Sequence, residues 1–177
     1  MKKVLCISII MLVSFSKLTF GFDATPMQLF YITKTAFPEI HEIAIFISPE
    51  RLEKEKVKIE RALAGQQLKG KIYKIRMSTD IGRRLKEMKD NSVLVIFSSD
   101  VLMDKKSKLY ILSKCKSKKI SLITSSHDYS DTGALLGVIP NSENKLDIIL
   151  NLKHNEYLAP LFTEDTILKM GVCQVIK

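Results

Sequence analysis

Small hydroxyl and carboxyl side chains recur in this sequence just after its apolar runs. Loops that follow parallel strands converge at one edge of a sheet, where helix amino termini direct N–H groups at ligands. We therefore expect this edge to bind a polar ligand or a small anion. Helix capping and turn formation remain the alternative explanation for each serine. The candidate binding residues are Ser48, Ser98, Ser99, Asp100, Ser125, Ser126, Asp128 and Gly133.

A nucleophilic triad is the enzymatic alternative at the same loops. It would combine Ser98 or Ser99 with His127 and Asp128, since the two loops should be neighbours. The serines lack the Gly-x-Ser-x-Gly turn that exposes a hydrolase nucleophile and builds its oxyanion hole. We therefore predict no catalytic residue and no enzymatic activity.

Metal and nucleotide sites are also not expected. The three histidines, His41, His127 and His154, are far apart in the sequence, so none has a second histidine at ligand spacing. Where a dinucleotide-binding loop would need glycines, the chain has the sequence Ser-Pro-Glu-Arg at 48–51. The sequence predicts a protein without metal or cofactor.

The amino-terminal segment has the layout of a secretion signal. Lys2 and Lys3 precede a largely apolar stretch at 4–15, and a small-residue cleavage site ends at Gly21. We expect residues 1–21 to be removed, which places the soluble domain 22–177 in the periplasm. An uncleaved anchor is the alternative, although the apolar stretch is short for a membrane span. Cleavage would lower the formal net charge from +9 to +6.

The remaining basic residues are spread over several segments, with glutamates interleaved in the first of them. A nucleic-acid surface would need a denser basic stripe with stacking aromatic residues, so nucleic acid is not an expected partner. Contact with anionic lipid or an acidic partner is more consistent with the charge, and the 114–119 cluster is the best candidate for it. Cys115 and Cys173 either form a disulfide in an oxidising compartment or remain separate thiols.

Strand and helix patterns alternate from residue 27 to residue 124. This order predicts an α/β domain of three layers with a mostly parallel sheet, similar to half of a Rossmann or flavodoxin-like fold. The inner face of one helix is assigned to Leu52, Val57, Ile59 and Leu63, and another helix carries Leu109, Leu112 and Cys115. The expected strands are 43–47, 71–77, 92–97 and 120–124, and the expected helices are 27–36, 49–64, 79–89 and 105–116.

The pattern changes after residue 124. A polar loop at 125–132 precedes two apolar stretches at 133–140 and 146–152, which together predict a β-hairpin. A helix capped by Thr163 and a strand at 172–176 complete the chain. The helix at 79–89 is expected to be capped by Ser78 or Thr79.

The order of these elements resembles two families. Phe37-Pro38, the strands 43–47 and 93–97, the segment 133–137 and the run 148–152 resemble the YfiR-like periplasmic proteins. The segments 133–138 and 151–152 are also similar to the TrpX type of substrate-binding component in ABC transporters. The chain departs from the YfiR-like pattern at 132–134, where it has Thr-Gly-Ala in place of a double glycine, and it has fewer cysteines than the disulfide-bonded members.

These resemblances imply different functions. The YfiR-like family implies a periplasmic regulator that binds an inner-membrane signalling protein, a diguanylate cyclase. The TrpX type implies a solute-binding component, of which this chain has the length of only one lobe. Because of this length, the sequence favours the regulator, with single-lobe binding of a small polar ligand as the alternative.

Overall fold

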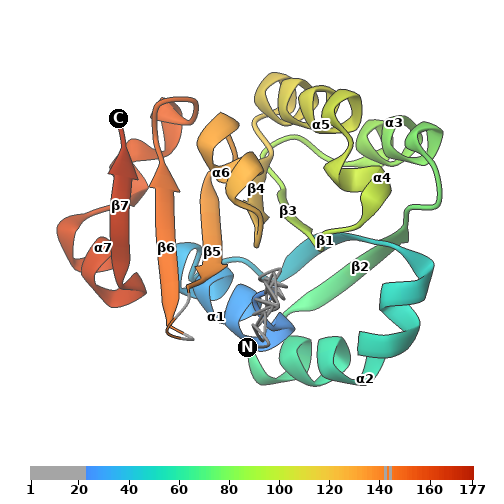
Figure 1. The fold of residues 1–177 in the computed structure, drawn as a ribbon. Helices are drawn as coiled ribbons and strands as arrows, with labels where there is room; N and C mark the ends of the chain where they lie inside the picture. Colours follow the sequence, from blue (N-terminus) through green and yellow to red (C-terminus); the bar gives the residue numbers. More distant parts are fainter. Residues whose placement is uncertain (1–22, 142, 144) are drawn as a thin grey trace, which may run out of the picture.

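The computed structural model describes residues 23–141, 143 and 145–177 (Figure 1). The expected signal segment 1–21 lies outside the described residues. One seven-stranded sheet organises the chain, with the strand order β2-β1-β3-β4-β5-β6-β7. The strands are β1 (Glu42–Ile47), β2 (Lys69–Lys74), β3 (Val93–Ile96), β4 (Ser121–Thr124), β5 (Leu136–Pro140), β6 (Leu146–Asn151) and β7 (Val172–Ile176).

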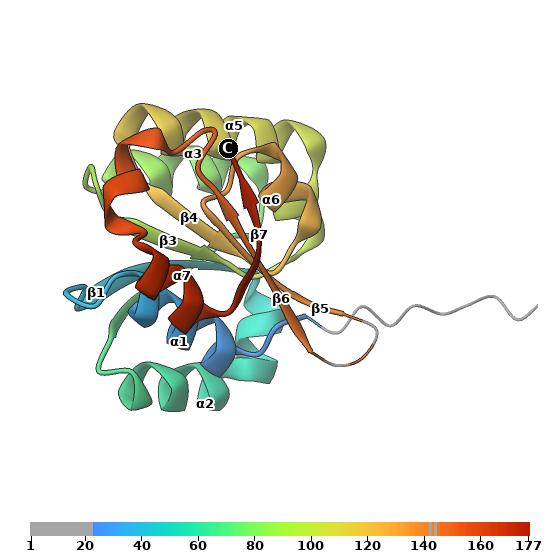
Figure 2. The ribbon, with the colours of Figure 1, turned by 90° about the vertical axis from the view of Figure 1, so that its left-hand side faces the viewer.

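Helices cover both faces of this sheet (Figures 1 and 2). Helices α1, α2 and α7 lie on one face, and α3, α5 and α6 lie on the other. The predicted single three-layer α/β domain is therefore confirmed. The helices are α1 (Pro26–Ala36), α2 (Pro49–Gly65), α3 (Ser78–Glu87), α4 (Asp100–Met103), α5 (Lys105–Lys118), α6 (His127–Thr132) and α7 (Glu164–Met170), with a 3-10 helix η1 at Glu156–Leu161.

The sheet is mostly parallel. Strands β1 to β5 run in one direction, and β6 pairs with β5 in the predicted antiparallel hairpin. Strand β7 pairs parallel to β6, so the last two strands run opposite to the first five. The carboxyl ends of β1 to β5 therefore share one edge of the sheet.

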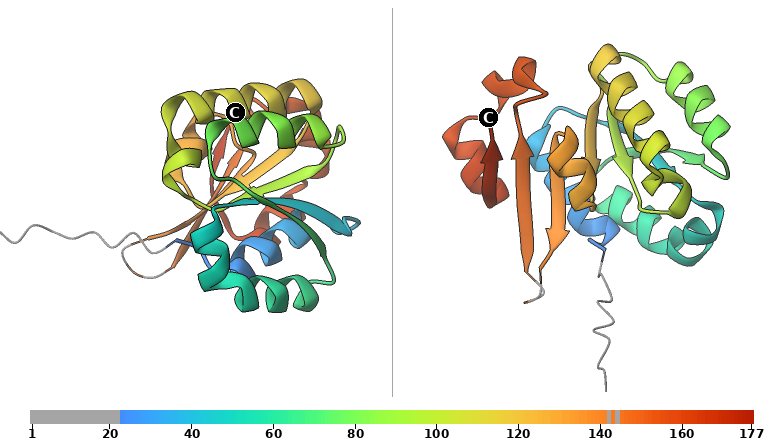
Figure 3. Two further views of the ribbon diagram at one scale, coloured as in Figure 1. Left: turned by 90° about the vertical axis from the view of Figure 1, so that its right-hand side faces the viewer. Right: turned by 45° about the horizontal axis from the view of Figure 1, so that its top comes forward.

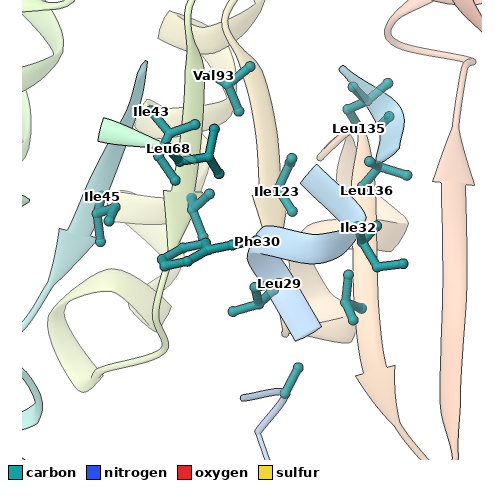
Figure 4. Packing of buried hydrophobic residues seen from close by; sticks show 14 of the residues in the cluster. Leu29, Phe30, Ile32, Ile43, Ile45, Leu68, Val93, Ile123, Leu135 and Leu136 are labelled. Atoms are coloured by element: carbon teal, nitrogen blue, oxygen red, sulfur yellow. The ribbon is translucent and has the colours of Figure 1, made fainter. Parts of the chain in front are cut away.

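Strand β1 is apolar on both faces because helices cover both of them. Ile43, Ile45 and Ile47 pack into the core beneath α1 and α2. Ala44 and Phe46 point to the opposite core. Leu29 and Phe30 of α1 belong to the same core as Ile43 and Ile45, and Figure 4 shows these side chains together. This period-two division of a continuous apolar run is typical of central parallel strands.

One inner-face assignment is wrong. Val57 is 56% exposed, whereas Ile59 is fully buried. Val57 lies five residues beyond the buried Leu52, which places it about 140° around the helix axis. The apolar stripe of α2 is therefore narrower than predicted. On α5, Leu109 is 55% exposed and Ile111 is fully buried.

Two local predictions also need correction. The amino terminus of α3 is capped by the Asp80 carboxylate, which accepts hydrogen bonds from the backbone of Arg76 (2.9 Å) and Met77 (3.2 Å), and not by Ser78 or Thr79. The segment 125–132, predicted as a loop, contains α6. Among the described residues, no helix is both long enough and apolar enough to cross a membrane.

Candidate functional site

A cleft opens at the point where the chain changes direction across the sheet. Strand β1 is followed by β2 on one side of it and then by β3 on the other, so the loops after β1 and β3 diverge there. Such a switch point, beyond the carboxyl ends of the strands, is where open α/β sheets bind ligands. The cleft here has a volume of about 1080 Å³. The left view of Figure 3 shows α1 and α2 beside the strands at this edge.

The cleft is built by the start of α1, the start of α2 and the segment after β3. Ser48 begins α2, and its Oγ accepts a hydrogen bond from the Arg51 backbone N–H at 3.2 Å. The residues that line the cleft are Asp23, Ala24, Thr25, Pro26, Ser48, Pro49, Glu50, Arg51, Lys54, Glu55, Lys58, Ile75, Arg76, Ser98, Ser99, Asp100 and Val101.

Arg51 connects three of the segments that form the cleft. Its guanidinium forms ion pairs with Asp23 and with Glu55, the latter at 3.2 Å. It also donates to the Ser98 carbonyl oxygen at 3.1 Å and lies 5.1 Å from the centre of the Phe97 ring. Arg51 is only 15% exposed, so these contacts hold the start of α1, the first turns of α2 and the end of β3 in one arrangement.

Acidic and basic side chains balance in the lining, with four of each. Two of the acids belong to the Arg51 cluster. Within the part of the chain that the structure describes, no ion pair engages the remaining charged groups, which are Glu50, Asp100, Lys54, Lys58 and Arg76. The cleft therefore presents both signs of charge to a bound molecule.

The amino terminus of α2 is already satisfied by the protein itself. Pro49 has no N–H, and Ser48 accepts from the Arg51 amide. The pKa of the Glu50 carboxyl lies below its ordinary value because it accepts its own backbone N–H and the Ser48 hydroxyl. Glu50 therefore stays ionised at the helix start. The predicted small anion at this helix start has no free amide there, and a ligand would be held by side chains.

Two polar atoms of the lining lack a partner in the described structure. They are Oγ of Ser99 and Oε2 of Glu55, and both atoms are inaccessible to water in this conformation. Because neither atom is exposed, a molecule in the cleft does not contact them in this conformation. The accessible polar groups of the lining are the exposed charged side chains of Glu50, Lys54, Lys58, Arg76 and Asp100.

The structure brings half of the predicted binding residues together. Ser48, Ser98, Ser99 and Asp100 all line the cleft. The other four predicted residues do not line it; these are Ser125, Ser126, Asp128 and Gly133.

The short helix α6 explains this separation. It packs against β5 and β6, where Asn151 Nδ2 donates to the Ser130 carbonyl oxygen at 2.9 Å. Asp128 lies on the surface and pairs with Lys108 at 3.4 Å. Gly133, at φ 138°, ends α6 beside His154. Ser125 is buried, and its Oγ has no partner in the described structure.

Sequence reasoning missed most of the charged lining. Arg51 and Glu55 are four residues apart on α2, as are Lys54 and Lys58, so each pair shares a helix face just after the Ser48 cap. This spacing is the feature of the sequence that could have predicted the charged lining. In the sequence alone, these charges are equally typical of a solvated helix face.

The two cysteines remain separate. Both thiols are free in the structure, with Cys115 buried and Cys173 exposed, so the disulfide alternative is not formed. Cys115 lies on the buried face of α5, and its burial raises the pKa of the thiol to about 12. Cys173 lies on the edge strand β7, where its Sγ is 3.3 Å from the Ile148 carbonyl oxygen. Among the described residues, no group of three or more His, Cys, Asp or Glu side chains could hold a metal ion.

Comparison with known proteins shows likeness in structure alone. No family model matches the chain, and no curated protein matches its sequence. A conserved domain protein from Vibrio cholerae O1 biovar El Tor has a TM-score of 0.71 at 11% identity over 86% of this chain. An ABC domain from Streptococcus pneumoniae in complex with L-Trp has a TM-score of 0.68 at 11% identity over 86%.

A third similar structure is a ligand-free, open substrate-binding protein with adhesive properties from Clostridium difficile, with a TM-score of 0.65 at 13% identity over 89% of this chain. The chain spans only 61%, 60% and 61% of the three neighbours' own lengths. At these identities the likeness shows the fold. It supports the predicted similarity to part of a substrate-binding protein and gives no support to the YfiR-like resemblance.

Proposed function

We propose that this chain is a non-catalytic binding domain that holds a small zwitterionic molecule, such as an amino acid, in the cleft at the end of β1 and β3. The observation that carries the proposal is the cleft itself, whose lining holds exposed acidic and basic side chains that form no ion pair among the described residues. Such a lining matches a ligand that carries both signs of charge.

The charges of the cleft give the ligand an orientation. Arg76, Lys54 and Lys58 supply cationic groups for a carboxylate. The exposed carboxylates of Glu50 and Asp100 supply acceptors for an ammonium group. A simple anion would leave these carboxylates without a partner, and an amine without a carboxylate would leave the three cations unused, so a zwitterion fits best.

Two structural neighbours are consistent with this function. The S. pneumoniae structure holds L-Trp, and the C. difficile protein is a substrate-binding protein. We infer that this α/β domain performs the corresponding role. The amino-terminal pattern Lys2-Lys3 followed by the apolar stretch 4–15 supports work in the periplasm, where such binding components act.

Regulation of a membrane signalling protein was the first expectation from the sequence. It would use an exposed protein-binding surface and would not require a cleft lined by both signs of charge. The cleft and the structural neighbours favour ligand binding, and we propose the solute-binding role in place of the regulatory one.

The test is calorimetric titration of the purified chain with the twenty L-amino acids. We compare Arg76→Gln and Asp100→Asn with matched controls outside the cleft, Arg61→Gln and Asp131→Asn. Each cleft variant should weaken the binding of the preferred amino acid by about tenfold or more, since a hydrogen bond to a charged group contributes about 1.5–3 kcal/mol. The controls should bind like the unmodified chain.

Two further ligands sharpen the result. The decarboxylated amine and the deaminated acid of the preferred amino acid should each bind at least tenfold more weakly, because each lacks one charged group. The proposal fails when no amino acid binds, when either analogue binds equally well, or when the cleft variants behave like their controls.

A further inference from the structure

A second cavity lies at the opposite end of the sheet from the cleft. Val93 and Ser121, the first residues of β3 and β4, form its floor, whereas the cleft lies beyond the last residues of β3. The cavity has a volume of about 520 Å³, within the range of small-molecule sites in proteins. It is independent of the proposed zwitterion site.

Apolar side chains from two separate segments form the walls. The turn after α1 contributes Phe37, Pro38 and Ile40, and η1 contributes Leu158 and Leu161. These segments are joined below the cavity, where Phe37 meets the Phe162 ring edge to face at 6.2 Å. The walls are therefore held by packing and do not depend on a ligand for their spacing.

The apolar surface of this cavity remains accessible. Leu161 is 53% exposed and Tyr157 is 41% exposed, although both are large side chains on η1 that line the cavity. Accessible apolar surface in a concave place favours an apolar occupant, because covering it removes that surface from water.

One end of the cavity is polar and fixed. Asn91 and Lys119 both have left-handed backbone, with φ values of 59° and 53°, in the turns before β3 and β4. A hydrogen bond of 3.0 Å from Asn91 N–H to the Lys118 carbonyl oxygen joins these turns. The Lys119 ammonium lies 5.8 Å from the centre of the Tyr157 ring, at the edge of the apolar wall. An amide and an ammonium group at one end match a carboxylate.

We propose that this cavity binds a small amphipathic carboxylic acid, with its apolar body between the Phe37–Ile40 turn and η1 and its carboxylate at Lys119 and Asn91. The cavity has one acidic lining residue, Glu39, which is exposed on the turn. A cationic headgroup would be repelled by the Lys119 ammonium group. A fully apolar molecule would form no hydrogen bond or ion pair at the polar end of the cavity.

The test is calorimetric titration of the full chain with decanoate below its micellar concentration, at low salt. Leu161→Asp places a negative charge on the wall without disturbing the core. Lys119→Asn removes the cation and keeps a residue that tolerates left-handed backbone. The matched controls are Leu168→Asp and Lys153→Asn, both exposed and outside the cavity.

Decanoate should bind saturably with one molecule per chain. Lys119→Asn should weaken it about fivefold, the upper range for an exposed ion pair. Leu161→Asp should weaken it at least tenfold, both controls should leave it unchanged, and decylamine should bind more weakly than decanoate. Arg76→Gln should have no effect, which separates this result from that for the cleft.

The proposal is overturned when decanoate does not saturate, when decylamine binds as tightly, or when the cavity variants match their controls. Sedimentation velocity adds one more outcome. A dimer that forms without decanoate and is lost in Leu161→Asp would show that a second copy of the chain covers this surface, which also overturns the proposal.

Discussion

Replacing Arg51 with methionine should destabilise the domain through the cleft. The change removes the ion pairs with Asp23 and Glu55, the 3.1 Å hydrogen bond to the Ser98 carbonyl oxygen and the cation–π contact with Phe97. Methionine retains most of the apolar packing of the arginine stem.

The magnitude follows from the burial of these contacts. Arg51 is 15% exposed and its two acidic partners are 36% and 23% exposed, so the ion pairs are discounted to about 0.5 kcal/mol each. The charged hydrogen bond contributes about 1.5 kcal/mol and the ring contact about 0.5 kcal/mol. The free energy of unfolding should fall by about 3 kcal/mol, which lowers Tm by about 6–12 °C.

Urea unfolding followed by circular dichroism measures this loss. The control is Lys56→Met, which breaks an exposed pair with Glu60 on the same helix, at 3.9 Å, and should cost less than about 0.5 kcal/mol. The m-value should remain the same in both variants. Equal stability of the two variants would refute the role of Arg51 as the connection between α1, α2 and β3.

Three further results are expected. Gly137→Ala should lower the free energy of unfolding by about 2–3 kcal/mol in urea, because its Cβ would lie 2.0 Å from Ser130 Oγ; an unchanged midpoint would contradict this. Ser125→Ala should raise that free energy by about 1 kcal/mol, since the buried hydroxyl has no partner in the described structure; a loss would reveal a missed contact. In the native protein, Ellman's reagent should modify Cys173 and leave Cys115 unreacted at pH 8. Burial raises the folded-state pKa of Cys115 from 9.0 to about 12. The contribution of the protonated thiol to stability should therefore be complete below pH 9 and should decline from pH 9 towards pH 12. In urea unfolding measured across this pH range, Cys115→Ala should show a smaller decline.

Much of the fold follows directly from the sequence. The continuous apolar run of β1 requires cover on both faces, and the Ser48-Pro49 pair starts α2 where predicted. The hairpin of β5 and β6 and the Thr163 cap of α7 were also predicted correctly. These features depend on neighbouring residues, so the sequence contains the information for them.

The candidate site was only partly predictable, because it depends on which loops meet in space. Sequence patterns gave the serines after β1 and β3 but not the strand order that makes their boundary the switch point. The loop after β4 was expected to join them, yet α6 turns it onto β5 and β6. Arg76 follows the edge strand β2 and reaches the cleft only because β2 pairs with β1.

The reversed direction of β6 and β7 sets the two described ends of the chain at opposite poles of the domain. Asp23 lines the cleft, whereas Ile176 pairs with Asn151 beside the amino ends of the parallel strands. If the protein is attached to a solid surface or a fusion partner after Lys177, the cleft faces away from the attachment. If it is attached just before Asp23, the attachment lies at the rim of the cleft and blocks it. The attachment site therefore decides whether an immobilised sample can report ligand binding.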